Sequence, residues 1–327
     1  MTMTRRLYKW AAWGLAGAIA SAAWAMDEVK PVPAMTSAIA TQAAILGSTW
    51  AGTRAVAVGD RGVVLLSDDG GARWRQARSV PVSFTLTSVS FADAQHGWAV
   101  GHGGSVIVTR DGGETWRVQR VVTTEDRPLF SVHFFDAHSG VAVGLWSLVL
   151  VTSDGGETWQ ERPLQPMPGA KKADLNLLGL FAGSDGVLFA AAERGQVLRS
   201  DDRGATWTYL STGYNGSLWC GAMLADGALL VGGQRGTLLR SEDHGQTWKP
   251  LRLDTKSSVT AIAGASQGVT LVGLDGLLAR SGDGRDFTIE TRPDGVAITS
   301  ALVTPRDGGR QALLFTRRGV VRGGGPP

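Results

Sequence analysis

The stretch TRDGGETW at residues 109–116 is followed 43 residues later by TSDGGETW at residues 152–159. The same pattern, S/T-x-D-x-G-x-T-W, occurs in three more divergent copies, SDDGGARW (67–74), SDDRGATW (200–207) and SEDHGQTW (241–248). A sixth copy, SGDGRDF (281–287), is one residue shorter and ends in Phe287. The closing aromatic residues are spaced by 42, 43, 48, 41 and 39 residues. A repeat of this length is typical of one blade of a β-propeller.

Each copy of the motif has the residues of a tight turn followed by a strand. The aspartate can accept hydrogen bonds from N–H groups ahead of it, and glycine adopts the positive φ that such a turn requires. The tryptophan supplies a large apolar surface to bury between neighbouring sheets. A calcium loop would need further spaced acids and a closing glutamate, so we predict no metal and no cofactor. The predicted structural residues are Asp69, Asp111, Asp154, Asp202, Asp243 and Asp283, with Trp74, Trp116, Trp159, Trp207 and Trp248.

The residues around each motif predict four short antiparallel strands, here named A to D in chain order. In the second unit these are LTSVSF, GWAVG, SVIVTR and TWRVQR, and the third unit follows in register. Strand-B segments recur at residues 54–59, 97–101, 140–144, 186–192, 227–233, 268–273 and 311–316. Since no helical pattern separates the units, the sequence predicts an all-β fold, a seven-bladed β-propeller of four-stranded antiparallel blades.

The seventh unit has strands A, B and C but ends before a strand D. A strand from the other terminus could complete it and would remove an exposed sheet edge. Residues 33–43 are free to do this, or to form strand A of blade 1. We therefore expect the two termini to meet and to close one blade.

The first 25 residues are predicted to be a secretory signal peptide. Arg5, Arg6 and Lys9 precede an apolar run that ends at an A-x-A site, Ala23–Ala25. The arginine pair leaves both the general and the twin-arginine export routes open. Residues 26–322 are then a single propeller domain, and residues 323–327 a disordered tail. The expected location is the periplasm, or the outer side of the inner membrane.

Removal of this leader takes away three bases and no acids, which leaves 29 of each in the remaining chain. A neutral chain lacks the clustered basic excess that nucleic-acid binding needs, so we expect no nucleic-acid partner. The lone Cys220 cannot form an internal disulfide and is interpreted as a small buried residue. We expect the protein to be a monomer.

The turns between strands B and C give the first indication of a functional surface. The position one residue before strand C is, in chain order, Arg61, Gly103, Trp146, Arg194, Arg235, Asp275 and Arg318. Equivalent turns lie on one face of a propeller, opposite the aspartate motifs. Four arginines there predict a positive patch suited to carboxylates or aromatic groups of a protein partner. The alternative is that they are solvated hairpin tips.

Trp146 extends this hypothesis, because an exposed aromatic side chain at a turn often marks an interaction surface. Packing of the indole against the adjacent loop is the alternative. No catalytic motif is evident: the five histidines lack ligand spacing, and neither a nucleophile elbow nor a phosphate loop occurs.

The repeat, read as L-x-S-V-x-F-x-D-x-x-x-G-W-A-V-G-x-G-G-x-I-x-x-T-x-D-G-G-x-T-W, resembles the photosystem II assembly and stability factor family of cyanobacteria and plastids. Its motif is similar to the Asp-box, or bacterial neuraminidase repeat. The resemblance covers about residues 45–322 and implies a non-enzymatic binding platform that helps a membrane protein complex to assemble. It also implies an arginine-bearing surface, for which Arg61, Arg194, Arg235 and Arg318 are the nearest counterparts.

A sialidase-like glycosidase is the alternative function, since those enzymes share the motif, and a glycan-binding module without turnover is a third. The enzyme would need three arginines around a carboxylate, an acidic proton donor and a tyrosine nucleophile. The chain after the leader has only Tyr209 and Tyr214, both near the end of blade 4.

Overall fold

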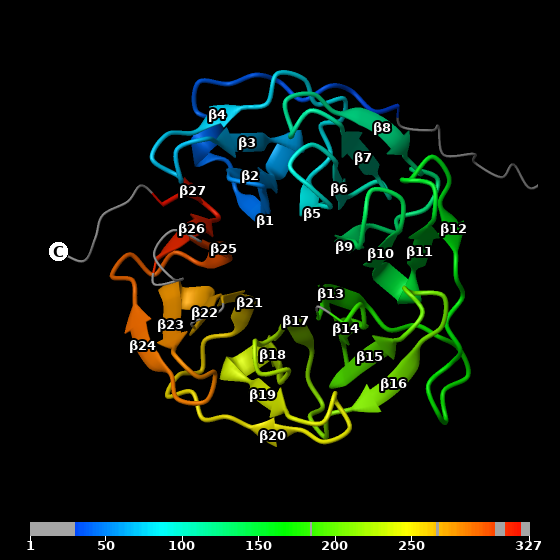
Figure 1. The fold of residues 1–327 in the computed structure, drawn as a ribbon, viewed down its shortest axis with the longest axis vertical. Helices are drawn as coiled ribbons and strands as arrows, with labels where there is room; N and C mark the ends of the chain where they lie inside the picture. Colours follow the sequence, from blue (N-terminus) through cyan, green and yellow to red (C-terminus); the bar gives the residue numbers. More distant parts are fainter. Residues whose placement is uncertain (1–29, 184, 266–267, 305–310, 322–327) are drawn as a thin grey trace, which may run out of the picture.

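The structure is a computed structural model that describes residues 30–183, 185–265, 268–304 and 311–321. The predicted signal peptide and the predicted tail at 323–327 lie outside these residues. Seven antiparallel sheets form a ring with their first strands around the centre and their last strands at the rim (Figure 1). The fold is therefore the seven-bladed β-propeller that the repeat predicts.

In each of the first four blades the four strands follow one another in chain order across the sheet, and short turns connect them. Blade 1 consists of β1 (Ile45–Ala51), β2 (Arg54–Gly59), β3 (Val64–Ser67) and β4 (Arg75–Gln76). Blade 2 consists of β5 (Leu86–Phe91), β6 (Gly97–Gly101), β7 (Val106–Thr109) and β8 (Arg117–Arg120). Blade 3 consists of β9 (Leu129–Phe134), β10 (Gly140–Gly144), β11 (Val149–Thr152) and β12 (Gln160–Glu161). Blade 4 consists of β13 (Leu177–Ala182), β14 (Leu188–Ala192), β15 (Gln196–Ser200) and β16 (Thr208–Ser211).

The remaining three blades follow the same order. Blade 5 consists of β17 (Leu218–Met223), β18 (Leu229–Gly233), β19 (Leu238–Ser241) and β20 (Lys249–Pro250). Blade 6 consists of β21 (Val259–Ala265), β22 (Gly268–Gly273), β23 (Leu277–Ser281) and β24 (Thr288–Thr291). Blade 7 has β25 (Ile298–Val303), β26 (Ala312–Thr316) and β27 (Gly319–Val320). Short 3-10 turns occur at η1 (Ala40–Gln42), η2 (Asp60–Gly62), η3 (Leu145–Ser147), η4 (Gln234–Gly236) and η5 (Leu274–Gly276).

The hydrophobic core lies between the blades, because successive residues of a strand point to opposite faces of its sheet. In β2, Val56 and Val58 pack against blade 2, whereas Ala55 and Ala57 pack against blade 7. The aromatic residues of the repeated motif fill the same spaces: the Trp74 ring meets the Phe315 ring of blade 7 edge to face, with centroids 5.5 Å apart. Each blade is therefore stabilised by both of its neighbours.

The ring closes between β1 and β25, which lie side by side (Figure 1). The Ser48 and Ser300 hydroxyls are 2.6 Å apart, and the Trp50 indole N–H donates to the Val303 carbonyl at 3.0 Å. These bonds join blades 1 and 7 as directly as sequence neighbours are joined.

The expectation for the N-terminal segment needs a correction in its details. Within the described residues blade 7 has three strands, and strand A of blade 1 is Ile45–Ala51 rather than part of residues 33–43. The N-terminal segment does reach blade 7, but it packs η1 against β27 instead of adding a strand. Pro31 and Pro33 cannot donate ladder hydrogen bonds, whereas Ile45–Ala51 has the alternating pattern of a half-buried strand.

Candidate functional site: the BC face and the box face

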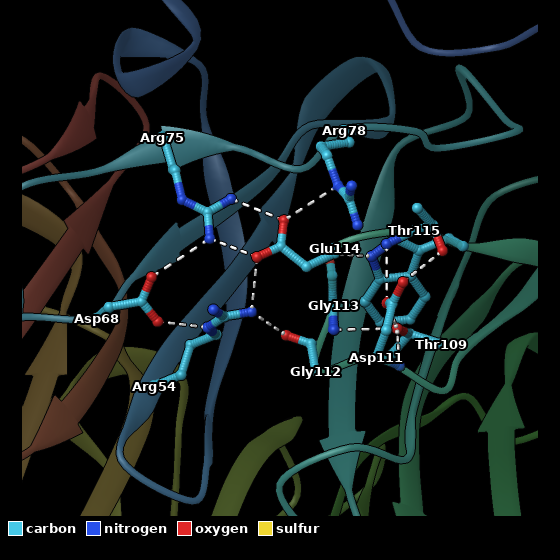
Figure 2. Close-up of polar contacts among 11 residues, drawn as sticks. Arg54, Asp68, Arg75, Arg78, Thr109, Asp111, Gly112, Gly113, Glu114 and Thr115 are labelled. Atoms are coloured by element: carbon cyan, nitrogen blue, oxygen red, sulfur yellow. Dashed lines mark hydrogen bonds and ion pairs between the residues drawn. The ribbon is translucent and has the colours of Figure 1, made fainter.

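Each repeated motif, called a box from here on, forms a hydrogen-bonded turn between strands C and D. In the second box the Thr109 hydroxyl donates to Asp111 Oδ1 at 2.8 Å and accepts from the Gly113 N–H at 2.9 Å. The Asp111 carboxylate also accepts from the Thr115 N–H at 2.9 Å and from its hydroxyl at 2.6 Å (Figure 2). The carboxylate thus takes the place of missing backbone acceptors in the turn.

The other boxes repeat this arrangement. The carboxylates of Asp69, Asp154, Asp202 and Asp243 accept from the N–H four residues ahead at 2.8–2.9 Å, and Asp283 accepts from the Arg285 N–H at 2.9 Å. Hydrogen bonds from the Thr158 hydroxyl and N–H lower the pKa of Asp154 to about 2. The indoles of Trp74, Trp116, Trp207 and Trp248 each donate to the glycine carbonyl three residues back. The buried indole N–H of Trp159 has no partner among the described residues.

The boxes share one face of the disc with the A–B turns. The Gly112 N–H donates to the Gln95 carbonyl in the A–B turn of the same blade, at 3.0 Å, and Gly155 bonds to His138 in the same way. We call this surface the box face. The B–C turns and the D-to-A crossovers form the opposite surface, which we call the BC face.

On the BC face, the turn residues predicted from sequence register share one backbone conformation. Arg61, Gly103, Trp146, Arg194, Arg235 and Asp275 all have φ between 53° and 63°, in the left-handed region. This conformation is unusual for residues with large side chains. In blade 7 the turn is a tighter hairpin at Arg317–Arg318, closed by the pairing of Thr316 with Gly319.

Close packing beneath these turns explains why their side chains face solvent. The next residue in the first turn is Gly62, where an added Cβ would meet the Val82 carbonyl oxygen at 2.0 Å. At Gly236 in blade 5 an added Cβ would meet the Thr255 carbonyl oxygen at 2.3 Å. Because these two glycines lie directly against D-to-A crossovers, the preceding residues, Arg61 and Arg235, are directed away from the protein.

The four predicted arginines are all exposed on the BC face. Arg194 forms an ion pair with Asp174, with Nη1 3.1 Å from Oδ1. Within the described residues, Arg61, Arg235 and Arg318 form no ion pair. The pKa of Asp294 is lowered mainly by a hydrogen bond from Arg292, and the positive charge of Arg318 adds to this. Most of the arginine charge on this face is therefore available to another molecule.

Ring order divides these arginines into two groups, which sequence register did not predict. Blades 7 and 1 are neighbours and carry Arg318 and Arg61; blades 4 and 5 are neighbours and carry Arg194 and Arg235. Asp275 of blade 6 separates the groups along one arc of the ring. The other arc carries Gly103 and Trp146.

Trp146 lies beside the Arg194 group. Its side chain is 55% exposed, so the indole is half packed and half open to solvent. Its backbone N–H donates to Asn176 Oδ1 at 3.0 Å, and the Asn176 amide in turn donates to Glu193 Oε1 at 3.0 Å. The turn that holds the indole is thus joined by Asn176 to the turn that holds Arg194.

A second polar cluster lies on the box face between blades 1 and 2, and it has no counterpart in the sequence analysis. The Glu114 carboxylate, 18% exposed, lies 2.5 Å from Arg75 Nη2, 3.0 Å from Arg54 Nη1 and 3.6 Å from Arg78 Nε (Figure 2). The hydrogen bond from Arg75 is the main cause of a lowered pKa for Glu114. The sequence signal for such a cluster is the glutamate that follows the second glycine of the box in two repeats, Glu114 and Glu157.

The residues considered for catalysis are scattered over the structure. The Tyr209 hydroxyl, on outer strand β16, donates to the Gln165 carbonyl at 2.8 Å, and the Tyr214 hydroxyl lies 3.4 Å from the Gln234 carbonyl. Burial raises the pKa of Cys220 to about 12 and lowers that of His133 to about 4. The described part of the chain contains no cluster of three metal-ligating side chains and no helix of a length and apolarity that could span a membrane.

Comparison with known proteins agrees with the seven-bladed propeller fold. The model of the family described as photosynthesis system II assembly factor YCF48 matches residues 72–218 and 122–271. No curated protein sequence matches the chain.

Solved structures show the same fold at low sequence identity. A structure titled "YCF48 bound to D1 peptide" is 19% identical with a TM-score of 0.69, and covers 88% of this chain and 97% of its own. YCF48 from Cyanidioschyzon merolae is 16% identical with a TM-score of 0.67, covering 86% and 95%. The RRP9 WD40 repeats are 10% identical with a TM-score of 0.65, covering 90% and 98%. Since the family model spans more than half of the chain, the protein belongs to the photosynthesis system II assembly factor YCF48 family.

Proposed function

We propose that this protein is an exported, non-enzymatic protein-binding platform that assists the assembly or stability of a membrane protein complex. The observation that carries the proposal is the BC face, where exposed arginines and a half-exposed tryptophan occupy equivalent turns of a rigid ring. A YCF48 structure with a bound D1 peptide supports protein binding by this family. The protein acts as a monomer outside the cytoplasm and needs no cofactor.

The chemistry of the BC face favours an acidic or aromatic-containing segment of the partner. Arginine guanidinium groups bind carboxylates through paired hydrogen bonds and stack on aromatic rings. Tryptophan and arginine are also the residues that most often contribute large shares of binding energy at interfaces. Two separate arginine groups favour a partner segment that crosses the ring over one that binds at a single point.

The proposal is tested by charge-neutral variants of each group. Crosslinking in cells, with the captured membrane proteins identified by mass spectrometry, compares Arg61→Gln/Arg318→Gln with Arg194→Gln/Arg235→Gln. The matched control is Arg73→Gln/Arg110→Gln, which removes two exposed arginines from the box face. We expect each BC-face pair to reduce capture of the same membrane partner and the control to leave it unchanged.

Equal capture by all three variants would refute the BC face as the binding surface. Capture of glycans or of soluble proteins alone would refute the membrane-complex client. Export is tested separately: N-terminal sequencing of the protein from the periplasm should begin at Met26. A full-length cytoplasmic chain would contradict it.

A further inference from the structure

A recess opens at the outer wall of the propeller, between blades 5 and 6. Together with the open solvent at its mouth it has a volume of about 370 Å³, and it is lined by Arg240, Glu242, Thr247, Lys249, Leu251 and Arg285. Arg240 lies in β19, Glu242 and Thr247 in the fifth box, Lys249 and Leu251 in or next to β20, and Arg285 in the shortened sixth box. The recess therefore lies at the junction where one blade's outer strand meets the next blade's box.

At two other blade junctions the same position is filled by a carboxylate of the chain itself. Glu114, in the second box, reaches back to Arg75 at the start of outer strand β4. Glu157, in the third box, reaches back to Arg117 at the start of β8 and to Arg110, 2.9 Å away. In both cases an acid that follows the box glycine is held by cations of the preceding blade.

The hydrogen bonds of the sixth box show which residue takes this position in blade 6. The Gly284 N–H donates to the Ser281 hydroxyl at 2.8 Å, as the Gly113 N–H does to Thr109. The residue after this glycine is Arg285, the counterpart of Glu114 and Glu157. The charge at the junction is thus reversed, because the reaching side chain is an arginine.

The recess therefore lacks the glutamate that the next blade's box supplies at the two other junctions. Arg285 pairs with Glu242 at 2.6 Å, the inverse of the pair between Glu157 and Arg110. Lys249 stands where Arg117 stands in blade 2, but within the described residues it has no ion-pair partner. The side chain of Arg240 is 3% exposed and pairs with Asp226 at 2.5 Å and with Glu242 at 3.3 Å. Among the described residues, the recess lining thus has three cations and one carboxylate, Glu242; a second carboxylate, Asp226, pairs with Arg240 from outside the lining, so one positive charge is unbalanced.

We propose that this recess binds a carboxylate side chain from an acidic segment of a partner protein. The partner's carboxylate would take the position that Glu114 and Glu157 take in their own junctions, between Lys249 and Arg285. Those two glutamates show that a carboxylate on an irregular, solvent-facing loop fits this geometry. The site lies on the outer wall near the box face, so it is separate from the BC face and does not depend on the function proposed for it.

The probe for the test is a fluorescein-labelled oligoglutamate peptide, with oligoglutamine of the same length as the control peptide. Binding is measured by fluorescence anisotropy at low salt, because exposed charge pairs are screened by added salt. The full-length protein carries Arg61→Gln, Arg194→Gln, Arg235→Gln and Arg318→Gln, so that BC-face arginines cannot contribute. Inorganic phosphate is added as a competitor in a second series.

We expect the glutamate peptide alone to bind this protein. Adding Lys249→Gln should weaken binding about threefold, and adding Lys249→Gln with Arg285→Gln about tenfold, as for the loss of one and two exposed ion pairs. The exchange Glu242→Arg/Arg285→Glu rebuilds the arrangement of blades 2 and 3 at unchanged net charge. It should abolish binding, because the introduced glutamate occupies the recess. Arg73→Gln is the control and should have no effect.

Unchanged affinity in both the Lys249→Gln variant and the exchange variant would overturn the proposal, as would equal binding of the glutamine peptide. No binding of the glutamate peptide would likewise overturn it, and displacement of the bound peptide by an equimolar concentration of inorganic phosphate would assign the recess to a small anion instead. If the exchange variant has a lower Tm than the parent protein, the affinity of the Lys249→Gln variant alone is used to test the proposal. Failure of crosslinking at the BC face would leave this result unaffected, so the two proposals fail separately.

Discussion

The box carboxylates should stabilise the propeller, and Asp111→Ala measures their contribution. The change removes the acceptor of three hydrogen bonds: those from the Thr115 N–H, the Thr115 hydroxyl and the Thr109 hydroxyl. The first two donors can turn to water, so each loss costs about 1 kcal/mol. The Thr109 side chain is buried, and leaving its hydroxyl without an acceptor costs about 2 kcal/mol. The expected loss in the free energy of unfolding is about 4 kcal/mol.

The assay is thermal unfolding followed by circular dichroism at neutral pH. For a domain of about 290 residues the entropy of unfolding is about 0.6 kcal/mol per kelvin, so 4 kcal/mol corresponds to a fall in Tm of about 7 °C. Asp111→Asn keeps one acceptor oxygen and should lose about half as much. The control is Asp126→Ala, which removes an exposed carboxylate from the crossover between blades 2 and 3 and should change stability by less than about 0.5 kcal/mol.

The same variant has a pH dependence whose direction follows from the structure. Burial raises the pKa of Asp111, but the hydrogen bonds from Thr115 and Thr109 outweigh it and the net pKa is lowered. A lowered folded-state pKa gives stability that is present above the unfolded-state value of about 3.9 and is lost as pH falls through the folded-state value. The difference between wild type and Asp111→Ala should therefore shrink below about pH 4. Equal Tm values for Asp111→Ala and Asp126→Ala at neutral pH would refute the reasoning.

Three further predictions follow from single contacts. Glu114→Gln should lower stability by about 2 kcal/mol at neutral pH by leaving Arg75 and its neighbours unpaired. Because the folded-state pKa of Glu114 is lowered, this loss in urea unfolding should begin to shrink below the unfolded-state value of about 4.3 and should disappear as pH falls through the folded-state value; a constant difference down to pH 3 would contradict the assignment. Arg235→Gly should raise stability by roughly 0.5 kcal/mol in the same assay, since it relieves a left-handed backbone at φ 57°, and a loss would show that the arginine side chain packs favourably. Gly319→Ala should lower Tm and speed amide exchange at residues 41–43, because the new Cβ would meet the Thr41 carbonyl oxygen at 1.9 Å; unchanged exchange would mean that η1 does not close against β27.

The architecture could be predicted from sequence because its information is local and repeated. Each blade is a set of short hydrogen-bonded hairpins, so one motif such as Thr109–Trp116 specifies a turn, the strand after it and the spacing to the next turn. The alternation of β2, with Val56 facing one neighbour and Ala55 the other, likewise follows from the two-residue period of a strand. Register among equal repeats also placed Arg61, Trp146, Arg194 and Arg235 at corresponding turns.

The tertiary structure determined those contacts that depend on which blades are neighbours in the ring. Closing the ring makes blade 7 a neighbour of blade 1. Arg318 and Arg61 therefore lie on adjacent blades, and η1 packs against β27. The salt-bridge cluster around Glu114 and the recess beside Arg285 form across blade junctions, where residues about 40 positions apart come into contact. The sequence by itself therefore determined the fold and the face of each turn, since these are properties of single repeats. Only the folded ring determined which charges meet and which remain unpaired, because ion pairing depends on distances between repeats.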